Sequence, residues 1–382
     1  MNVKSILEKL VSFDVLGGES NLDLAKWIVQ YLSDRGVEVH MLYNEERNKA
    51  LVHCRIGPAT DGGVVLSGHM DVVPVEGQDW NTNPFILTEK DGLLYGRGSC
   101  DMKGFLACCL SMVSEFIAAD LKKPVYFAFS YDEEIGCMAG DLMAQTIRDF
   151  YPEICTDAII GEPSLMEPII GQKGICFYRT YVNGSEGHSS RIMEEVSAVH
   201  ESARLILWLE DKMKRLKAER TDVRFNPPHS SIHVGKVKGG IATNIIADQC
   251  YFDWDVRTIP GDDFDDIMND FYGYCEKRMD ELKSLFPSFK IYTEEVHPPV
   301  PPLDTASDSK ILKLLRAIGI NGPEQTVSFA AEAGQFERNG FDAIICGPGS
   351  IAQAHRANEF IAIDQLEKGR KMLRNLIHVL AK

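Results

Sequence analysis

The sequence predicts an α/β fold in which a doubly wound, mixed sheet is interrupted by an inserted, ferredoxin-like α+β domain. Three observations favour this architecture. Strand-like and helix-like segments alternate in the first half of the chain, the middle follows a β-α-β-β-α-β order, and the alternation returns after a proline-rich stretch at residues 297–304. We therefore expect one domain formed by residues 1–174 and 296–382 and an inserted domain formed by residues 175–295.

The first half of the chain contains helical and strand patterns in alternation. Residues 22–36 and 103–119 carry apolar side chains at spacings of three and four, and the first of these helices stops at a glycine. Residues 63–68, 124–130 and 156–161 are short apolar runs with the length of a buried strand. Strands that alternate with helices in this way form largely parallel sheets that are covered on both faces.

The middle of the chain has the pattern of a one-sided sheet with two helices. Residues 175–184 alternate apolar and polar side chains, as a strand with one buried face does. The following elements are a helix, two strands, a helix and a strand, at residues 194–216, 230–240, 249–259, 262–286 and 289–296. After the proline-rich stretch the α/β pattern resumes with a helix, a strand and a helix, at residues 309–319, 341–347 and 364–382.

Composition and charge exclude several classes of protein. With 382 residues, 45% of them hydrophobic, the chain can bury more than one core, and no apolar run reaches the roughly 18 residues needed to span a bilayer. A formal net charge of −16 argues against a nucleic-acid or anionic-membrane partner. The ten cysteines include no CxxC pair, and the start of the chain has no secretory cleavage pattern. We expect a globular, cytoplasmic protein with reduced thiols.

Side chains that commonly bind metals follow the strand-like runs of the α/β part or stand at a helix start. They are His69, Asp71, Asp101, Glu133, Glu134, Glu162 and His355. The carboxyl ends of parallel strands meet at one edge of a sheet, so we expect these side chains to lie together. Clustered carboxylates repel one another unless a cation lies between them. Two histidines with several carboxylates suit Zn²⁺, Co²⁺ or Mn²⁺, and the lack of cysteine ligands favours a catalytic over a structural site.

Each of these residues also has an ordinary structural interpretation. A single histidine such as His69 is more often a hydrogen-bonded core or loop residue, and Asp101 is suited to cap a helix. Glu133 and Glu134 also fit a solvated turn. Their joint placement after apolar strands is what favours a metal site over these alternatives.

Six motifs occur in one order along nearly the whole chain, namely SGHMDVVP, GRGSCDMKG, YDEEIG, GEPS, GHSS and AHRANE. In this set and order the sequence resembles the M20 family of dizinc metallopeptidases and deacylases. Within that family it is most similar to the bacterial acetylornithine deacetylases, through GEP, AEAGQF and GPGSIAQAHRANE. The resemblance implies a metal-binding catalytic domain, a site for two divalent ions (Zn²⁺ or Co²⁺), and a homodimer formed through the inserted lid domain.

The resemblance also implies how the metal ligands are divided between the two ions. His69 and Glu162 would bind one metal, and Glu134 and His355 would bind the other. Asp101 would bridge the two.

Three residues would have catalytic roles under the same resemblance. Asp71 would hold the second ring nitrogen of His69, and Glu133 would be the general base that moves a proton from the attacking water to the leaving amine. His188, in the inserted domain, would stabilise the oxyanion in the partner subunit's site. Without the resemblance, a solvent-facing histidine at a strand end is the preferred interpretation of His188.

Substrate contacts are implied for Arg257, Asn244 and Glu332. Arg257 would grip a carboxylate with two hydrogen bonds, and its alternative is a surface salt bridge. Asn244 would contact substrate or be a turn residue. Glu332 would pair with a cationic substrate side chain or cap a loop, and the sequence favours neither interpretation.

The implied function is that of a metal-dependent amidohydrolase acting on a small N-acyl amino acid. The expected substrate is N-acetyl-L-ornithine, cleaved to L-ornithine and acetate in arginine biosynthesis. Succinyl-diaminopimelate desuccinylase, aminoacylase and dipeptidase activities are alternatives within the family. A non-catalytic metal-binding assembly protein on the same fold is the alternative from another class, and the presence of Glu133 counts against it.

Overall fold

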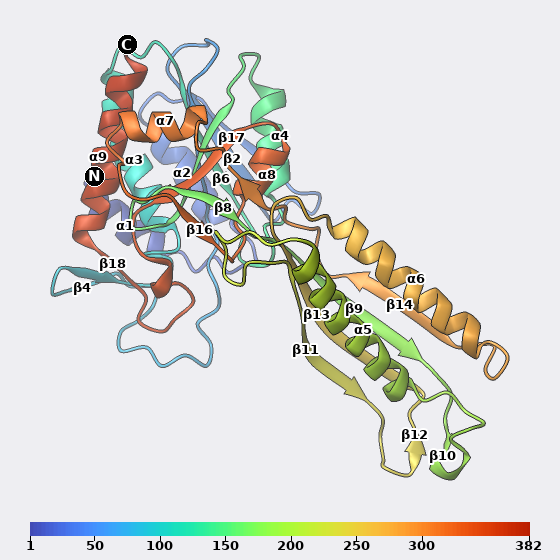
Figure 1. Ribbon diagram of the computed structural model, residues 1–382. Helices are drawn as coiled ribbons and strands as arrows, with labels where there is room; N and C mark the ends of the chain where they lie inside the picture. Colours follow the sequence, from blue (N-terminus) through green and yellow to red (C-terminus); the bar gives the residue numbers. More distant parts are fainter. The chain divides into compact units, whose positions relative to one another are not determined.

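The computed structural model describes residues 1–382, which form two compact units (Figure 1). Unit 1 comprises Met1–Gly171, Leu303–Thr326 and Ala331–Lys382, and unit 2 comprises Gln172–Pro302 and Val327–Ala330. The chain thus forms unit 2 mainly with one continuous insertion into unit 1. The four residues Val327–Ala330 also belong to unit 2, although the sequence assigns them to the first domain.

Unit 1 is built on a nine-stranded mixed sheet, in the order β1-β2-β6-β3-β7-β17-β8-β15, with β16 paired to β8. Its strands are β1 Val39–Tyr43, β2 Ala50–Ile56, β3 Val64–His69, β6 Val125–Ser130, β7 Asp157–Pro163, β8 Ile169–Gln172, β15 Leu303–Asp304, β16 Gln325–Val327 and β17 Asp342–Gly347. The central strands β6, β3, β7 and β17 are parallel to one another. Every residue of β3 and β6 is buried, as expected for apolar runs covered on both faces.

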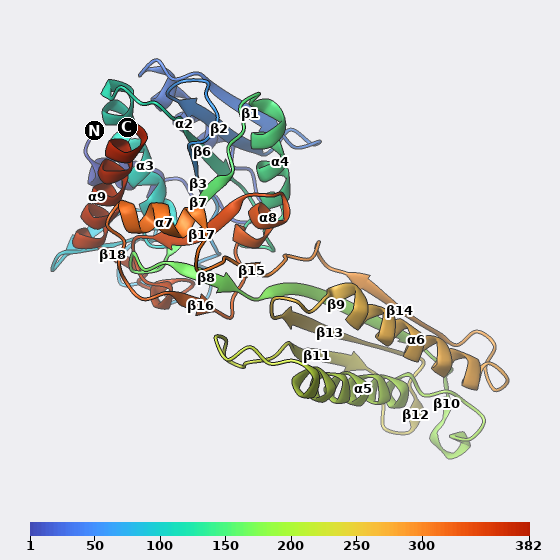
Figure 2. The same cartoon turned by 45° about the horizontal axis from the view of Figure 1, so that its top comes forward.

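Helices cover both faces of this sheet. They are α1 Val3–Val11, α2 Leu22–Ser33, α3 Lys103–Ala118, α4 Gly140–Phe150, α7 Lys310–Ala317, α8 Ala333–Arg338 and α9 Ile363–Leu380. Five of them, α1, α2, α3, α7 and α9, share one core with strand residues such as Leu66, Phe127 and Ile344. α4 and α8 pack against each other and against β6, β7 and β17, on the other side of the strands from α3 and α9 (Figure 2).

A small antiparallel sheet completes unit 1. It is formed by β4 Thr88–Lys90, β5 Leu93–Tyr95 and β18 Phe360–Ala362, in the order β18-β5-β4. Through this sheet, the segment before α3 pairs with the segment that leads into α9, so two distant parts of the chain are held side by side.

Unit 2 is a four-stranded antiparallel sheet with two helices on one face. Its main elements are β9 Gly174–Asn183, α5 Ala198–Glu219, β11 Ser231–Gly239, β13 Gln249–Thr258, α6 Phe264–Leu282 and β14 Lys290–Glu295, with a short pair, β10 Gly187–His188 and β12 Ile245–Ile246. The strand order β11-β13-β9-β14 is the ferredoxin-like order. Alternate residues of β9 and β13 are buried with Leu205, Leu209, Ile267 and Phe271 of the two helices.

The predicted fold class is confirmed. The sequence did not predict β1 and β2, which extend the sheet beyond β6, nor the helices α1, α4 and α8, the short strands β8, β15 and β16, and the small sheet β18-β5-β4. No helix is both long and apolar enough to cross a membrane.

Candidate metal centre

Most of the predicted metal ligands of unit 1 lie at the carboxyl ends of four adjacent parallel strands. β3 ends at His69, Glu162 lies near the end of β7, Glu133 and Glu134 follow β6, and His355 follows β17. These side chains therefore lie at one edge of the sheet, where the sequence predicted them.

The donor atoms of these residues are close together. The ligand atoms of His69, Glu133 and Glu162 lie within 4.8 Å of one another, and so do those of His69, Asp101 and Glu134. From His69 Nε2 the nearest carboxylate oxygens are Asp101 Oδ1 at 3.2 Å and Glu162 Oε1 at 3.6 Å. His69 is 1% exposed, so its imidazole lies wholly inside the cluster.

Asp101 lies between the two histidines. Its Oδ1 is 3.2 Å from His69 Nε2, while its Oδ2 is 3.5 Å from His355 Nε2. His355 Nε2 also lies 2.9 Å from Glu134 Oε2. One carboxylate thus presents one oxygen to each of two donor groups, which is the arrangement that a bridging ligand requires.

Asp71 contacts the cluster differently from the sequence-based expectation. His69 Nδ1 is 2.9 Å from the Asp71 carbonyl oxygen, whereas the Asp71 carboxylate is 3.6 Å from that nitrogen. The carboxylate instead accepts hydrogen bonds from the main-chain N–H groups of Glu133 and Glu134, at 3.2 and 3.1 Å. The backbone of Asp71 holds the imidazole, and its side chain holds the turn that carries two of the acidic residues.

Burial and mutual repulsion disfavour the ionised form of the carboxyl groups in the cluster. Burial raises the pKa of Glu133, and the neighbouring carboxylates add to this shift. Burial, followed by Asp101, raises the pKa of Glu162 and brings that of Glu134 to about 7. The hydrogen bond with Glu134 raises the pKa of His355 to about 9. Without a cation, the cluster is therefore stabilised by holding protons.

Divalent metal ions fit this donor set. Carboxylate oxygens and the His69 imidazole come together in two overlapping groups with no cysteine among them, which is the chemistry of catalytic Zn²⁺, Co²⁺ or Mn²⁺ sites. Positive charge from the ions would replace the protons that the crowded carboxylates otherwise need.

Glu332 lies near the cluster but is enclosed. Its side chain is 1% exposed, and burial raises its pKa to about 7. It stands just before α8 and makes no side-chain cap hydrogen bond there. The loop-capping interpretation has no hydrogen bond to support it, and a contact with a cationic substrate side chain stays a prediction.

Comparisons with known proteins identify the family. The profile described as peptidase family M20/M25/M40 matches residues 65–379. The chain belongs to this family. Among solved structures, aminopeptidase PepT from Bacillus cereus is 17% identical with a TM-score of 0.77, covering 100% of this chain and 98% of that one. The metallo-carboxypeptidase Sso-CP2 from Sulfolobus solfataricus is 18% identical with a TM-score of 0.77, covering 100% and 99%.

A third solved structure is described as a dinuclear metal binding peptidase of the M20 family. This protein, YXEP from Bacillus subtilis, is 14% identical with a TM-score of 0.63, and the match covers 99% of this chain and 97% of that one. M20 membership makes the chain a metal-dependent hydrolase of the peptidase and amidohydrolase type. None of these three neighbours is described as an acetylornithine deacetylase, so that subtype stays a prediction.

Unit 2 of this M20 chain holds the other three predicted residues. The pairing of β10 with β12 brings His188 opposite Ile245, and Ser189 N–H donates to the Asn244 carbonyl at 3.0 Å. His188 Nδ1 lies 2.8 Å from Ser190 Oγ and the imidazole is exposed. His188 and Asn244 are therefore neighbours at one end of the unit.

Arg257 lies near the opposite end of β13 from this pair. It is eight residues along the strand from Gln249, which at about 3.3 Å per residue is roughly 26 Å. Its Nη1 donates to the Ser328 carbonyl at 3.0 Å, and its Nε is 3.5 Å from Asp255. Unit 2 does not bring Arg257 together with His188.

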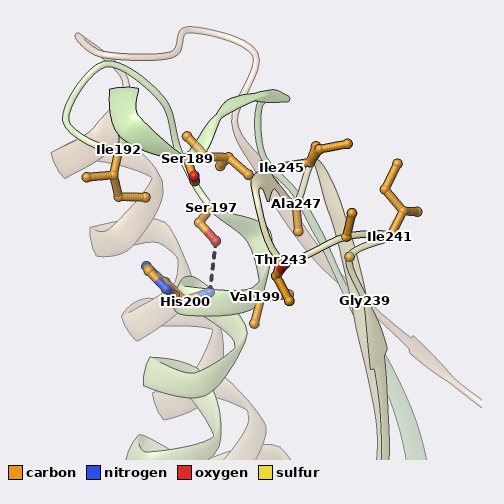
Figure 3. A pocket seen from close by; sticks show the side chains of 13 residues that line it. Ser189, Ile192, Ser197, Val199, His200, Gly239, Ile241, Thr243, Ile245 and Ala247 are labelled. Carbon is orange, nitrogen blue, oxygen red and sulfur yellow. Dashed lines mark hydrogen bonds between the residues drawn. The ribbon is translucent and has the colours of Figure 1, made fainter.

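A hollow of about 570 Å³ lies beside β10 and β12 (Figure 3). It is bordered by the N-terminal end of α5 and by the loop between β11 and β12, with Ser189 at its side. Most side chains around it are apolar, and Ile241 is 82% exposed. An apolar surface of this kind adjoins the predicted oxyanion-stabilising histidine.

Proposed function

We propose that this chain is a dinuclear metal-dependent amidohydrolase that removes the acetyl group of N-acetyl-L-ornithine. The observation that carries the dinuclear assignment is the position of Asp101, with one carboxylate oxygen near His69 and the other near His355. This geometry supports two ions rather than one, because a carboxylate with both oxygens engaged links two centres.

The same distances support the ligand division that the family resemblance implies. His69 and Glu162 would hold one ion, Glu134 and His355 the other, and Asp101 both. When bound, such ions polarise the amide carbonyl and lower the pKa of water towards about 7. The protein keeps these donors in place through the carboxyl ends of its parallel strands.

Glu133 is suited to move the proton. Its Oε2 lies 4.0 Å from His69 Nε2, its Oε1 accepts from Cys137 Sγ at 3.3 Å, and it belongs to neither pair of ligands above. It would accept the proton of the attacking water and deliver it to the leaving nitrogen as the C–N bond breaks. Asp71 positions it by binding its main-chain N–H.

Substrate choice is supported by charge and by Arg257. The planar guanidinium of Arg257 can bind an α-carboxylate with two hydrogen bonds. A net charge of −16 disfavours the approach of a more anionic substrate such as N-succinyl-diaminopimelate, whereas N-acetylornithine carries a cationic side chain. The M20 neighbours described as peptidases make a dipeptide the competing substrate.

Hydrolysis assays with Zn²⁺- or Co²⁺-loaded protein test this proposal. N-acetylornithine, N-acetylcitrulline, N-succinyl-diaminopimelate and a dipeptide are compared by kcat/KM, with Glu133→Gln protein as the control for contaminating activity. We expect N-acetylornithine to lead by at least about tenfold. A lead for the dipeptide would replace the deacetylase assignment by a peptidase one. Two bound ions with no hydrolysis of any amide would favour the non-catalytic alternative.

We further propose a homodimer in which His188 serves the partner's site. Arg257 is roughly 26 Å along β13 from Gln249, and His188 lies on the separate β10–β12 pair beyond that end of the strand (Figure 1), so a site that uses both would take them from two copies. β11 is an edge strand of the sheet of unit 2, and Val237 on it, Leu207 on α5 and Ile241 beyond it are more than half exposed. Exposed edges and apolar patches are surfaces on which a second copy packs.

A further inference from the structure

Three polar side chains of unit 1, Gln78, Arg97 and Glu359, link the loop before Asp101 to the loop that carries His355. We propose that this network, called here the loop clamp, positions Asp101 and His355 for metal binding and thereby sets the affinity of the second ion. The proposal rests on the proposed dinuclear centre. None of the three side chains is among the ligands.

Glu359 fixes the backbone at Asp101. Its carboxylate is fully buried and accepts from the main-chain N–H groups of Gly98 at 3.0 Å, Cys100 at 2.8 Å and Asp101 at 3.0 Å. Arg97 Nη1 donates to the same carboxylate at 2.8 Å and neutralises it. Four hydrogen bonds to one buried carboxylate leave the Asp101 main chain little freedom to shift.

The backbone of His355 is held from the other side. The residue has φ +62°, a left-handed conformation that costs a non-glycine residue about 1 kcal/mol or more and persists only where its surroundings enforce it. Gln78 Nε2 donates to the His355 carbonyl at 2.9 Å, and Arg97 Nη1 donates to the next carbonyl, that of Arg356, at 3.2 Å. Because the imidazole itself is 59% exposed, its position depends on these main-chain bonds and on its contact with Glu134 rather than on packing.

Arg97 joins the two halves of the clamp. It is 1% exposed, Nη2 donates to Gln78 Oε1, and its guanidinium lies over the Trp80 ring at 5.1 Å. Trp80 Nε1 also donates to Gln78 Oε1, at 3.1 Å. Gln78 therefore has a fixed orientation, with its amide N–H directed at His355.

The two ends of the clamp predict different losses. Gln78 donates to the backbone of His355 and makes no hydrogen bond to that of Asp101, so its loss should weaken the ion held by His355 and Glu134 and spare the other. Glu359 contacts the backbone of Asp101, which serves both ions, so its loss should weaken both. Removing a group that positions a metal ligand typically costs 10- to 100-fold in metal affinity.

Co²⁺ titration of the metal-free protein, followed by calorimetry and visible absorption, tests this proposal. Gln78→Glu keeps the acceptor for Arg97 and Trp80 but cannot donate to His355, and Gln78→Met lacks the donor without adding charge. Asn375→Asp is the matched control, because Asn375 Nδ2 donates to a loop carbonyl, that of Ile318, at 2.8 Å away from the cluster.

We expect wild type and Asn375→Asp to bind two Co²⁺ ions with affinities within twofold of each other. Both Gln78 variants should bind the first ion normally and the second about 10- to 100-fold more weakly. Glu359→Gln should weaken both ions. If that variant does not fold, the Gln78 pair decides the result.

The titration distinguishes failure of the dinuclear centre from failure of the loop clamp. Wild-type protein that binds fewer than two ions contradicts the dinuclear centre itself. Wild-type protein that binds two, with Gln78 variants of unchanged affinity, overturns the clamp even if their metal-free forms unfold at lower temperature, because a purely structural role lowers stability without changing the affinity for the second ion.

Discussion

Acid destabilisation through His53 is a prediction that the structure makes quantitative. His53 lies on β2, is 2% exposed, and its Nδ1 is 3.0 Å from the Tyr151 hydroxyl. Its ring stacks on that of His40 at 5.2 Å. Burial, with a smaller contribution from His40, lowers its pKa from 6.5 to about 4.

The sign follows from proton binding. Between pH 6.5 and 4 the unfolded chain binds a proton at His53 that the folded chain does not, so the free energy of unfolding falls as the pH falls through this window. Below about pH 4 both states are protonated and the loss stops. A shift of this size corresponds to about 3 kcal/mol in total, of which about 2 kcal/mol is lost between pH 7 and pH 4.5.

Urea unfolding of the metal-free protein at pH 7 and pH 4.5 measures this loss, with chelator present throughout so that metal release does not contribute. His53→Asn, which keeps a polar group near Tyr151 but does not titrate, should lose about 2 kcal/mol less than wild type over this interval. His378→Asn, at an exposed position of α9, should behave as wild type. An equal pH dependence in His53→Asn and wild type would refute the reasoning.

Three further predictions concern the metal centre and the dimer. Glu133→Gln should keep its metals by elemental analysis and lose at least about 10² in kcat, since an amide neither accepts nor delivers the proton; near-normal turnover would remove Glu133 from that role. Asp101→Ala should lose both ions together and His355→Ala mainly one, and two tightly bound ions in Asp101→Ala would contradict the bridge. Inactive His188→Ala and Glu133→Gln chains, mixed and allowed to exchange subunits, should recover activity in roughly a quarter of the sites if His188 acts across the dimer. No recovery, with exchange confirmed by differently tagged subunits, would contradict that assignment.

Local sequence patterns were sufficient to predict the architecture of the chain. Short apolar runs such as those of β3 and β6 are typical of strands in a sheet that is covered on both faces. The alternation of apolar and polar residues in β9 is typical of a strand with one buried face. β1 and β2 were not predicted. Six of the seven residues of β2 are buried, but His53 and Arg55 interrupt its apolar run, so its sequence does not resemble a buried strand.

The edge on which the candidate ligands lie was also predictable from the sequence. Parallel strands end on one side of their sheet whatever their separation along the chain, so His69, Glu134, Glu162 and His355 share one edge; they also lie close together because β6, β3, β7 and β17 are neighbours in the sheet.

What the tertiary structure alone decided is the contact that each polar group makes. The Asp71 carboxylate binds the N–H groups of Glu133 and Glu134 rather than the imidazole of His69, and Gln78 donates to the carbonyl of His355, which is 277 residues away in the sequence. Arg97 and Glu359 stand within recognised motifs, but their pairing depends on how two loops fold over each other. Strand periodicity is a local property of the backbone, whereas a hydrogen bond between distant loops depends on distances of a few tenths of an ångström that only the packed chain determines.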